Sequence, residues 1–513
     1  MSEYGEQSEA ARASLFAASR ELYFALEADL ASRVAAGSTA DALEDLIDER
    51  GREVHRALLQ ACLDAYAQRE QRAETAPVGA DGTTRTRVEK GHSRTLTSRF
   101  GPVVVTRLAY RAPRPKTSNL HLADLELNLP AGAHSHTLRR DLAVEATRGS
   151  FDGAVDAVER STGQKVGKRQ AVELTRSAAC DVEAFYARAK LEVAGAGRVL
   201  VLQFDGKGVV MRPEGLRPAT AKAARQKKHR LATRLSPGEK SNRKRMAEIA
   251  VVHDAAPAPR TVDDVLPLPG RVNAEVNAVP ARVKGPKATG KWLTASVVDD
   301  IATVVAAGFD EAERRDRHHQ RTWVVLVDGD NTQIAAIQAE AARRKVTVHV
   351  VVDFVHVTEY VWTAARSFFE TGDPDAEKWV RTQLRQVLRG KALAVAAGIL
   401  RRATKNQYDA QERKGADTAA AYLRAKAPYL DYGTALANGW PIATGVVEGS
   451  CRHLVKDRLE ITGARWGLEG AESVLLLRAV VVNGDFDAYW AYHLEQEQQR
   501  NHYSKFAPLD TAA

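Results

Sequence analysis

Two aspartates and one glutamate in this chain have the sequence surroundings of metal ligands. Asp205 and Asp328 each end an apolar run of strand length and are followed at once by glycine, and Glu448 lies within Gly-Val-Val-Glu-Gly. Runs of this kind are typical of strands buried on both faces, so we expect both aspartates to emerge at strand ends. We expect Glu448 at the start of a helix. Carboxylate oxygens in such places select Mg²⁺ or Mn²⁺.

Adjacent strands can place Asp205 and Asp328 side by side, and a helix that crosses the sheet can add Glu448. Clustered like charges are unfavourable without cations, so convergence of the three would itself imply bound metal. We predict that they hold two ions, Mg²⁺ or Mn²⁺, which activate the attacking oxygen and stabilise the leaving oxygen in phosphoryl transfer. For any one residue alone, the alternative is a turn cap or a surface position.

The most basic segment of the chain directly follows Asp205. Between residues 212 and 245 only Glu214 and Glu239 oppose a dense series of lysines and arginines. A solvated face is the alternative, but this imbalance beside a candidate catalytic carboxylate favours contact with DNA phosphates, which position DNA without reading its sequence. The residues expected at this DNA interface are Lys207, Arg212, Arg217, Lys222, Arg225, Lys227, Lys228, Arg230, Arg243, Lys244 and Arg245.

Composition limits the class of protein. The chain has 513 residues, an apolar fraction of 44% and a net charge of +9, which suits a globular protein of two to four domains with a polyanionic partner. Its three cysteines lie far apart, which excludes a disulfide framework or a CxxC zinc site and indicates a reducing cytoplasm. No apolar run approaches membrane-spanning length, so no membrane association is expected.

The N-terminal third is expected to be helical and then to form a β-hairpin. Residues 1–75 show apolar positions at helical spacing opposite a charged face, which predicts helices that pack on each other or on a second subunit. Residues 76–137 are expected to be a linker and a hairpin, because alternating runs at 95–100 and 103–108 flank Gly101-Pro102.

Residues 138–195 are expected to be helical and could read DNA. Ser150 starts one helix, residues 161–164 break the pattern, and Lys165, Lys168 and Arg169 open the next helix. A helix, a turn and a basic helix start are typical of a helix-turn-helix DNA reader, and ordinary bundle packing is the equal alternative.

Residues 196–356 are expected to form the first part of an α/β catalytic core. The apolar pattern predicts two strands, possibly a third, then helix, strand, helix and strand, which indicates a sheet of short elements. Residues 357–440 are helical throughout and are interpreted as an insertion. Residues 441–513 are expected to resume the core and to end in a helix.

Several blocks resemble bacterial insertion-sequence transposases of the ISKra type. They are residues 204–209, 325–330, 447–458 with 462–466, the basic run, and the tail 483–490. The resemblance covers most of the chain from about residue 95. Such transposases are DDE enzymes with a ribonuclease H-like core. The resemblance therefore implies a mixed sheet with a helical insertion, preceded by a helical and β-hairpin DNA-binding region, and places the catalytic triad on Asp205, Asp328 and Glu448.

Further residues follow from the same resemblance. Asp353-Phe-Val-His356 is similar to the acidic-x-x-His signature of Mutator-like DDE enzymes and would support the metal ligands, the alternative being a strand-end cap and a core histidine. Many DDE enzymes carry a basic residue seven positions after the catalytic glutamate, where this chain has Val455. Other residues are expected to contact DNA instead, namely Arg452, Lys456 and Arg458, with Trp466 stacking on a splayed base or packing in the core.

The function implied is that of a cytoplasmic, nucleoid-associated DNA transposase. It would bind element ends, free a 3′ hydroxyl and use it to attack target DNA. Because two ends must meet, a homodimer or larger synaptic complex is expected. The rivals are a ribonuclease H-like nuclease or resolvase without strand transfer, and a non-catalytic DNA-binding protein derived from a transposase.

Overall fold

The computed structural model describes residues 14–113, 117–188, 198–229, 231, 233, 241–267 and 282–507. The chain divides into two compact units, one made of Met1–Ala187 with Gly484–Ala513 and one made of Arg188–Asn483. The C-terminal segment from Gly484 therefore packs with the N-terminal unit, whereas the sequence assigned it to the catalytic core. Within the described residues, no helix is long and apolar enough to cross a membrane.

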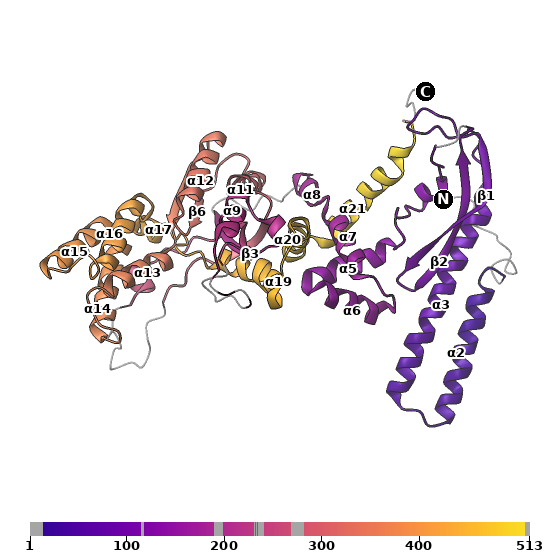
Figure 1. Cartoon of the computed structure of the whole chain (residues 1–513), viewed down its shortest axis with the longest axis horizontal. Coiled ribbons are helices and arrows are strands. Elements are labelled where there is room, and N and C mark those ends of the chain that lie inside the picture. Colours follow the sequence, from indigo (N-terminus) through magenta and orange to yellow (C-terminus); the bar gives the residue numbers. More distant parts are fainter. Residues whose placement is uncertain are drawn as a thin grey trace. The chain divides into compact units, whose positions relative to one another are not determined.

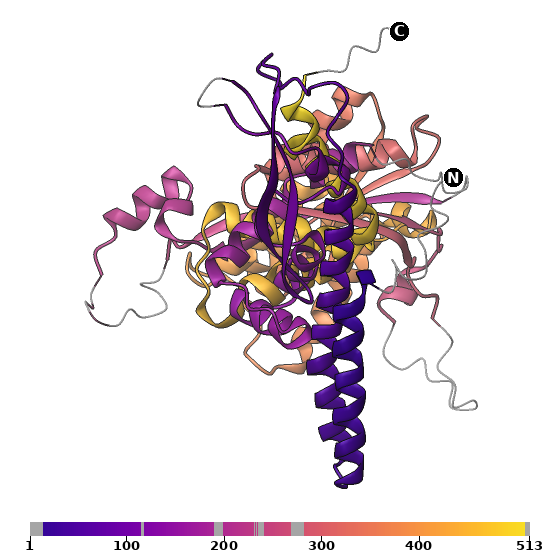
Figure 2. The ribbon, with the colours of Figure 1, turned by 90° about the vertical axis from the view of Figure 1, so that its right-hand side faces the viewer.

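The first unit begins with two long antiparallel helices, α2 (Ala17–Ala35) and α3 (Ala40–Arg69), which lie side by side (Figures 1 and 2). At 1.5 Å per residue, α3 is about 45 Å long. None of its residues is fully buried. Its Leu59 and Leu63 pack on the hairpin that follows.

The expected β-hairpin is present and is longer than predicted. Strands β1 (Arg87–Ser98) and β2 (Gly101–Arg111) pair antiparallel in a register that opposes Ser98 and Gly101. Gly101 has φ +128°, a backbone conformation that residues with a Cβ rarely adopt. The hairpin therefore turns at Arg99 and Phe100, two residues earlier than expected, and Gly101 and Pro102 are already paired with β1.

Three helices follow and share one small core. After the short α4 (Leu122–Glu126), helices α5 (His136–Arg148), α6 (Phe151–Thr162) and α7 (Lys168–Ala179) bury a common apolar cluster. Ser150 caps α6 by accepting a hydrogen bond from the Gly153 N–H at 3.0 Å, and Gly163 ends that helix at φ +70°. The unit is completed by α8 (Val182–Arg188), α21 (Phe486–Asn501) and a 3₁₀ turn, η6 (Tyr503–Lys505).

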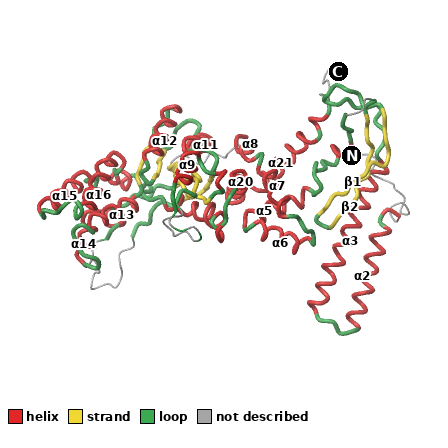
Figure 3. The backbone as a smooth tube through the Cα atoms, viewed as in Figure 1, coloured by secondary structure: helices red, strands yellow, loops and turns green. Residues whose placement is uncertain are grey.

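The second unit is built on one mixed five-stranded sheet, whose strands are yellow in Figure 3. The strand order is β5-β4-β3-β6-β7. Strand β3 pairs antiparallel with β4, and β4 with β5, whereas β3–β6 and β6–β7 are parallel. The strands are β3 (Val199–Val210), β4 (Lys244–Ala255), β5 (Ala288–Ser296), β6 (Trp323–Val327) and β7 (Val348–Val352). The α/β class is confirmed, and the third strand that the sequence left open is β5.

Helices cover both faces of the sheet. Helix α11 (Ile301–Arg315) packs so closely on β3 that a Cβ on Gly308 would lie 2.8 Å from the Phe204 ring. Side chains alternate along a strand, so Gln203 and Asp205 face the other side, where they contact α18 (Gly445–Ser450) and the π-helix η4 (Cys451–Lys456). The remaining elements of this unit outside the helical insertion are η1 (Pro213–Gly215), α9 (Pro218–Gln226), α10 (Val262–Val265), α12 (Asn331–Arg344), α19 (Asp457–Leu459), η5 (Ile461–Gly463) and α20 (Leu468–Asn483).

The predicted helical insertion lies between β7 and α18. It starts three residues earlier than expected, because Asp353 caps its first helix by accepting a hydrogen bond from the Val355 N–H at 2.9 Å. Arg402 lies over the rings of Phe368 and Phe369 at 4.7 and 4.5 Å, which anchors part of its aromatic core. Its elements are α13 (Phe354–Ala365), α14 (Pro374–Leu388), α15 (Ala392–Lys405), α16 (Lys414–Lys426), η3 (Ala427–Tyr429) and α17 (Tyr432–Ala437).

Candidate active site

Three aspartates lie at matching positions of three neighbouring parallel strands. Asp328 and Asp353 directly follow β6 and β7, but Asp205, which we expected at a strand end, lies within β3, which continues to Val210 because it stays paired with β4. The β3–β6 register pairs Gln203 with Leu326, so Asp205 and Asp328 each stand two residues beyond a matched pair. The β6–β7 register pairs the last residues of those strands, so Asp328 and Asp353 each come one residue later. Continuing the register would place the three residues next to one another on adjacent strands.

Glu448 lies with Asp353 and His356. One donor atom from each of these three side chains lies within 4.8 Å of the others. The Thr444 hydroxyl donates to a carboxylate oxygen of Asp353 and also lies 3.1 Å from Glu448 Oε1. Asp205 and Asp328 belong to no such compact group in the described part of the chain. Asp353 and His356, which the sequence predicted only to support the metal ligands, are therefore the residues whose donor atoms lie within 4.8 Å of Glu448.

A buried polar chain fixes the helix of Glu448 on the sheet. Gln203 is 1% exposed, and its Oε1 accepts a hydrogen bond from the Val447 N–H at 2.9 Å. Its amide nitrogen must then donate to His253 Nε2 at 3.1 Å, which makes His253 neutral with its proton on Nδ1, facing the Asp254 carbonyl at 3.2 Å. Burial lowers the pKa of His253 to about 4, in agreement with that state.

A second contact joins the helix of Glu448 to Asp205. The Cys451 thiol donates to Asp205 Oδ2 at 2.9 Å, while Asp205 Oδ1 accepts from the Gly206 N–H at 2.7 Å. Burial raises the pKa of Cys451, and the Asp205 carboxylate raises it further, so the thiol keeps its proton. This bond crosses from α18 and η4 to the strand that carries the first predicted acid.

None of the four carboxylates Asp205, Asp328, Asp353 and Glu448 forms an ion pair with lysine or arginine among the described residues.

Glu248 is a further acid close to Asp205, and the sequence predicted it only as part of a strand. Burial raises the pKa of Glu248 and the carboxylate of Asp205 raises it further, whereas Arg217 opposes the shift. The signal in the sequence was an acid inside the apolar run 247–252. The register of β3 and β4 places it opposite Gly206.

The predicted DNA-contacting residues fall into three groups. Arg230 lies outside the described residues. The side chains that are partly exposed are Lys207, Arg217, Lys227, Arg243 and Arg245, and those that are largely exposed are Arg212, Lys222, Arg225, Lys228, Lys244, Arg452 and Lys456. Arg458 and Trp466 are buried.

Arg245, Arg458 and Trp466 form contacts within the protein that give each of them a structural role. The guanidinium of Arg245 donates to the carbonyls of Gly215, Val297 and Val298. Arg458 is 2% exposed and lies 4.7 Å over the Trp466 ring, whose indole N–H donates to the Leu459 carbonyl. Trp466 therefore packs in the core, the alternative that the sequence left open, and it has no face free for a base.

The π-helix explains the apolar residue seven positions after Glu448. A π-turn is closed by hydrogen bonds five residues apart instead of four, so it holds one residue more than an α-turn. Two turns of α-helix take about seven residues, and with η4 inserted they take about eight. Lys456 thus completes two turns after Glu448 and is exposed, whereas Val455 is turned inward and is fully buried.

The first unit presents a basic helix start to solvent. Lys168 and Arg169 begin α7 after the turn at Gly163, and their side chains are 63% and 93% exposed. Their partners, Asp152 and Glu173, are also exposed.

Comparison with known proteins adds no assignment to this geometry. No protein-family model matches the chain, and no curated protein matches it.

Proposed function

We propose that the chain is a DDE-type DNA transposase with a ribonuclease H-like core, which binds element ends and catalyses divalent-metal-dependent cleavage and strand transfer of DNA. The observation that carries the proposal is the group of Asp353, His356 and Glu448, next to the strands that carry Asp205 and Asp328, because these four carboxylates pair with no lysine or arginine among the described residues. Such a group is unfavourable unless a cation neutralises it. The mixed sheet and the helical insertion before α18 agree with the core that the sequence resemblance implies.

The donor set fits a divalent cation. Asp353 and Glu448 supply oxygen ligands, which suit Mg²⁺ and Mn²⁺, and His356 supplies an imidazole, a ligand better suited to transition metals. We therefore expect Mn²⁺ to bind this set more tightly than Mg²⁺. Asp205 and Asp328, on the neighbouring strands, would hold a second ion. Bound ions would activate the attacking oxygen and stabilise the leaving one.

The rest of the site would hold DNA against these carboxylates. Lys456 and Arg452 are exposed on the turns that follow Glu448, where they can contact the phosphates beside the reacting bond. Lys222 and Arg225 on α9 would extend that contact along the backbone. The exposed basic start of α7 would enter a groove of the element end. Such an enzyme would act in the cytoplasm, as a dimer or larger assembly that pairs two ends.

The test uses oligonucleotide duplexes carrying the ends of the element that encodes the chain. With Mn²⁺ or Mg²⁺, water attack should leave a 3′ hydroxyl, and pre-cut ends should then be joined to a target duplex. Asp205→Asn and Glu448→Gln should abolish both steps without abolishing binding of the ends. Cleavage without any joined product would favour the nuclease or resolvase instead, and end binding with no metal-dependent cleavage would favour the non-catalytic binding protein.

A further inference from the structure

The turn that carries Asp328 is shaped by its own hydrogen bonds. In residues 328–330, here called the Asp328 turn, Asp328 Oδ1 accepts from the Asp330 N–H at 2.8 Å. Asp330 in turn caps α12 by accepting from the N–H groups of Thr332 and Gln333. Gly329 between them has φ +100°, a region that side chains with a Cβ rarely adopt. These bonds fix one carboxylate oxygen and leave the other available.

Helix α16 of the insertion holds the outer side of this turn. The Tyr422 hydroxyl donates to the Asp328 carbonyl at 3.3 Å, and Lys426, one helical turn later, donates to the Asn331 side chain. Lys426 is 6% exposed, although lysine is rarely buried. Two polar contacts from one face of α16 therefore reach Asp328, the first residue of the turn, and Asn331, the residue that follows it.

The contact between turn and helix is close. A Cβ on Gly329 would lie 2.9 Å from the Tyr422 hydroxyl oxygen and 3.6 Å from Lys426 Cε. Glycine is thus required here both by the backbone conformation and by the approach of α16. The turn cannot move toward the insertion without displacing Tyr422.

Tyr422 is itself fixed by a second element of the site. Its ring stacks on Tyr360 with centroids 3.6 Å apart and an angle of 9° between the planes. Tyr360 lies on α13, one turn after His356, and α13 is capped by Asp353. The stack therefore connects the Asp328 turn to the helix that carries two of the proposed ligands.

We infer that Tyr422 and Lys426 are positioning residues, which hold the Asp328 carboxylate for cation binding and make the helical insertion part of the metal centre. This rests on the proposed function only in taking Asp328 as a ligand. The hydroxyl of Tyr422 need not touch DNA or metal. It acts through the main-chain carbonyl of Asp328 and so through the angle at which that carboxylate leaves the strand end.

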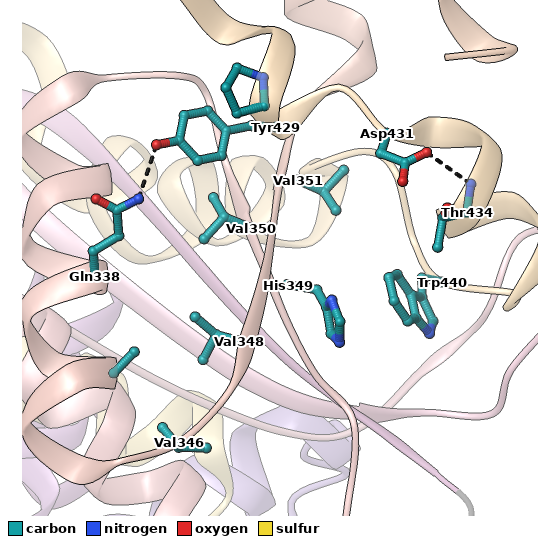
Figure 4. A pocket seen from close by; sticks show the side chains of 12 residues that line it. Gln338, Val346, Val348, His349, Val350, Val351, Tyr429, Asp431, Thr434 and Trp440 are labelled. Atoms are coloured by element: carbon teal, nitrogen blue, oxygen red, sulfur yellow. Dashed lines mark hydrogen bonds between the residues drawn. The ribbon is translucent and has the colours of Figure 1, made fainter.

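The test measures Mn²⁺ binding by the full chain, without DNA, in an electron paramagnetic resonance titration. Tyr422→Phe keeps the stack on Tyr360 and removes only the hydroxyl, and should weaken Mn²⁺ binding about tenfold, as the loss of a ligand-orienting hydrogen bond does. Tyr429→Phe is the matched control. Its hydroxyl accepts from Gln338 at 3.0 Å beside a separate cavity of about 460 Å³ along β7 (Figure 4). This control should leave Mn²⁺ affinity within about twofold of the wild type.

A second variant keeps the test decisive if Tyr422→Phe does not fold. Lys426→Met keeps the length of the buried side chain, removes its contact with Asn331, and should also weaken Mn²⁺ binding. Equal Mn²⁺ affinity in Tyr422→Phe and Tyr429→Phe would overturn the inference, even if the wild type cleaves DNA. Weakened binding in Tyr422→Phe with no cleavage by the wild type would sustain it and sink the proposed function.

Discussion

Within the residues that the structure describes, two groups of side chains have donor atoms close enough to hold a metal, and they differ in one respect. The first group is Cys180, Asp181 and His493 of the first unit, and the second is Asp353, His356 and Glu448 of the second unit. In each group, one possible ligand atom from every residue lies within 4.8 Å of the others. In the first unit, Arg500 donates to both oxygens of Asp181 at 2.6 and 2.8 Å, and His493 donates at 2.7 Å. In the second unit no arginine or lysine of the described chain takes that place.

The difference separates an ion pair from a proposed cation site. Burial raises the pKa of Asp181, but hydrogen bonds from His493 and Arg500 outweigh it and hold that pKa well below its usual range. The charge of Asp181 is therefore already balanced. Among the described residues, the carboxylates of Asp205, Asp328 and Asp353 accept hydrogen bonds from hydroxyl, thiol and N–H donors and pair with no lysine or arginine, so under the proposed function a cation from solution would balance them. Distance alone does not distinguish a ligand set from a salt bridge.

The largest expected effect comes from removing a ligand charge. Glu448→Gln and Asp353→Asn keep side-chain shape, and the amide oxygen introduced by the second substitution can still cap α13. Each should reduce metal-dependent cleavage by at least about a hundredfold, because a lost ligand costs more than a lost supporting contact. Gel assays of labelled end duplexes measure this. Glu377→Gln, an exposed acid of α14 paired with Arg381, is the control and should cleave at the wild-type rate.

Low pH should weaken the hydrogen bonds through Gln203 and His253 that hold the Glu448 helix on the sheet. The folded pKa of His253 is about 4 and its unfolded pKa is about 6.5, so its neutral form favours folding. That contribution is fully present above pH 6.5 and falls by about 3 kcal/mol as the pH drops toward 4. Hydrogen exchange in β3 and α18 should rise over this window. His253→Asn, which does not titrate, should lose that part of the pH dependence; an unchanged profile would contradict the Gln203–His253 chain.

Removing Arg500 should leave the Asp181 group of the first unit without its arginine, as is the case for the Asp353 group of the second unit. Arg500→Met leaves Asp181 buried with only His493 and the Cys180 thiol. We expect a loss of about 2 kcal/mol, between an exposed and a fully buried pair since Arg500 is 42% exposed, together with new Mn²⁺ binding. Hydrogen exchange in α21 and Mn²⁺ titration measure these. Arg343→Met, at an exposed pair with Glu340, should change stability by less than about 0.5 kcal/mol.

The smallest effect is expected at Lys456. If it contacts one phosphate, Lys456→Ala should weaken end binding only a few-fold and reduce the slope of log K against log salt by about 1. Lys378→Ala, an exposed lysine of α14 paired with Asp375, should leave that slope unchanged. An equal salt slope in the two variants would remove Lys456 from the interface.

The sequence predicted the helices and strands better than the side-chain contacts between them. Apolar runs predicted β6 before Asp328 and the first half of β3, because burial on both faces leaves a continuous apolar signature. The continuation of β3 past Asp205 was not predicted, because residues 206–210 lack that signature and pair with β4. The partners of Glu448 were not predictable, since they depend on the pinning of α18 by Gln203 and Thr444, far apart in the chain. The π-helix could not be foreseen either, because its extra residue follows from packing that buries Val455 and not from local composition. Trp466 gave no local sign of whether it faced core or solvent.

The central claim, that the acids of the second unit hold divalent metal whereas Asp181 does not, is tested most directly by anomalous diffraction from crystals of the full chain soaked in Mn²⁺. The account predicts a manganese peak bounded by Asp353, His356 and Glu448, and none beside Asp181 and Arg500. A peak beside Asp181, or none among the three second-unit side chains at saturating Mn²⁺, would contradict it.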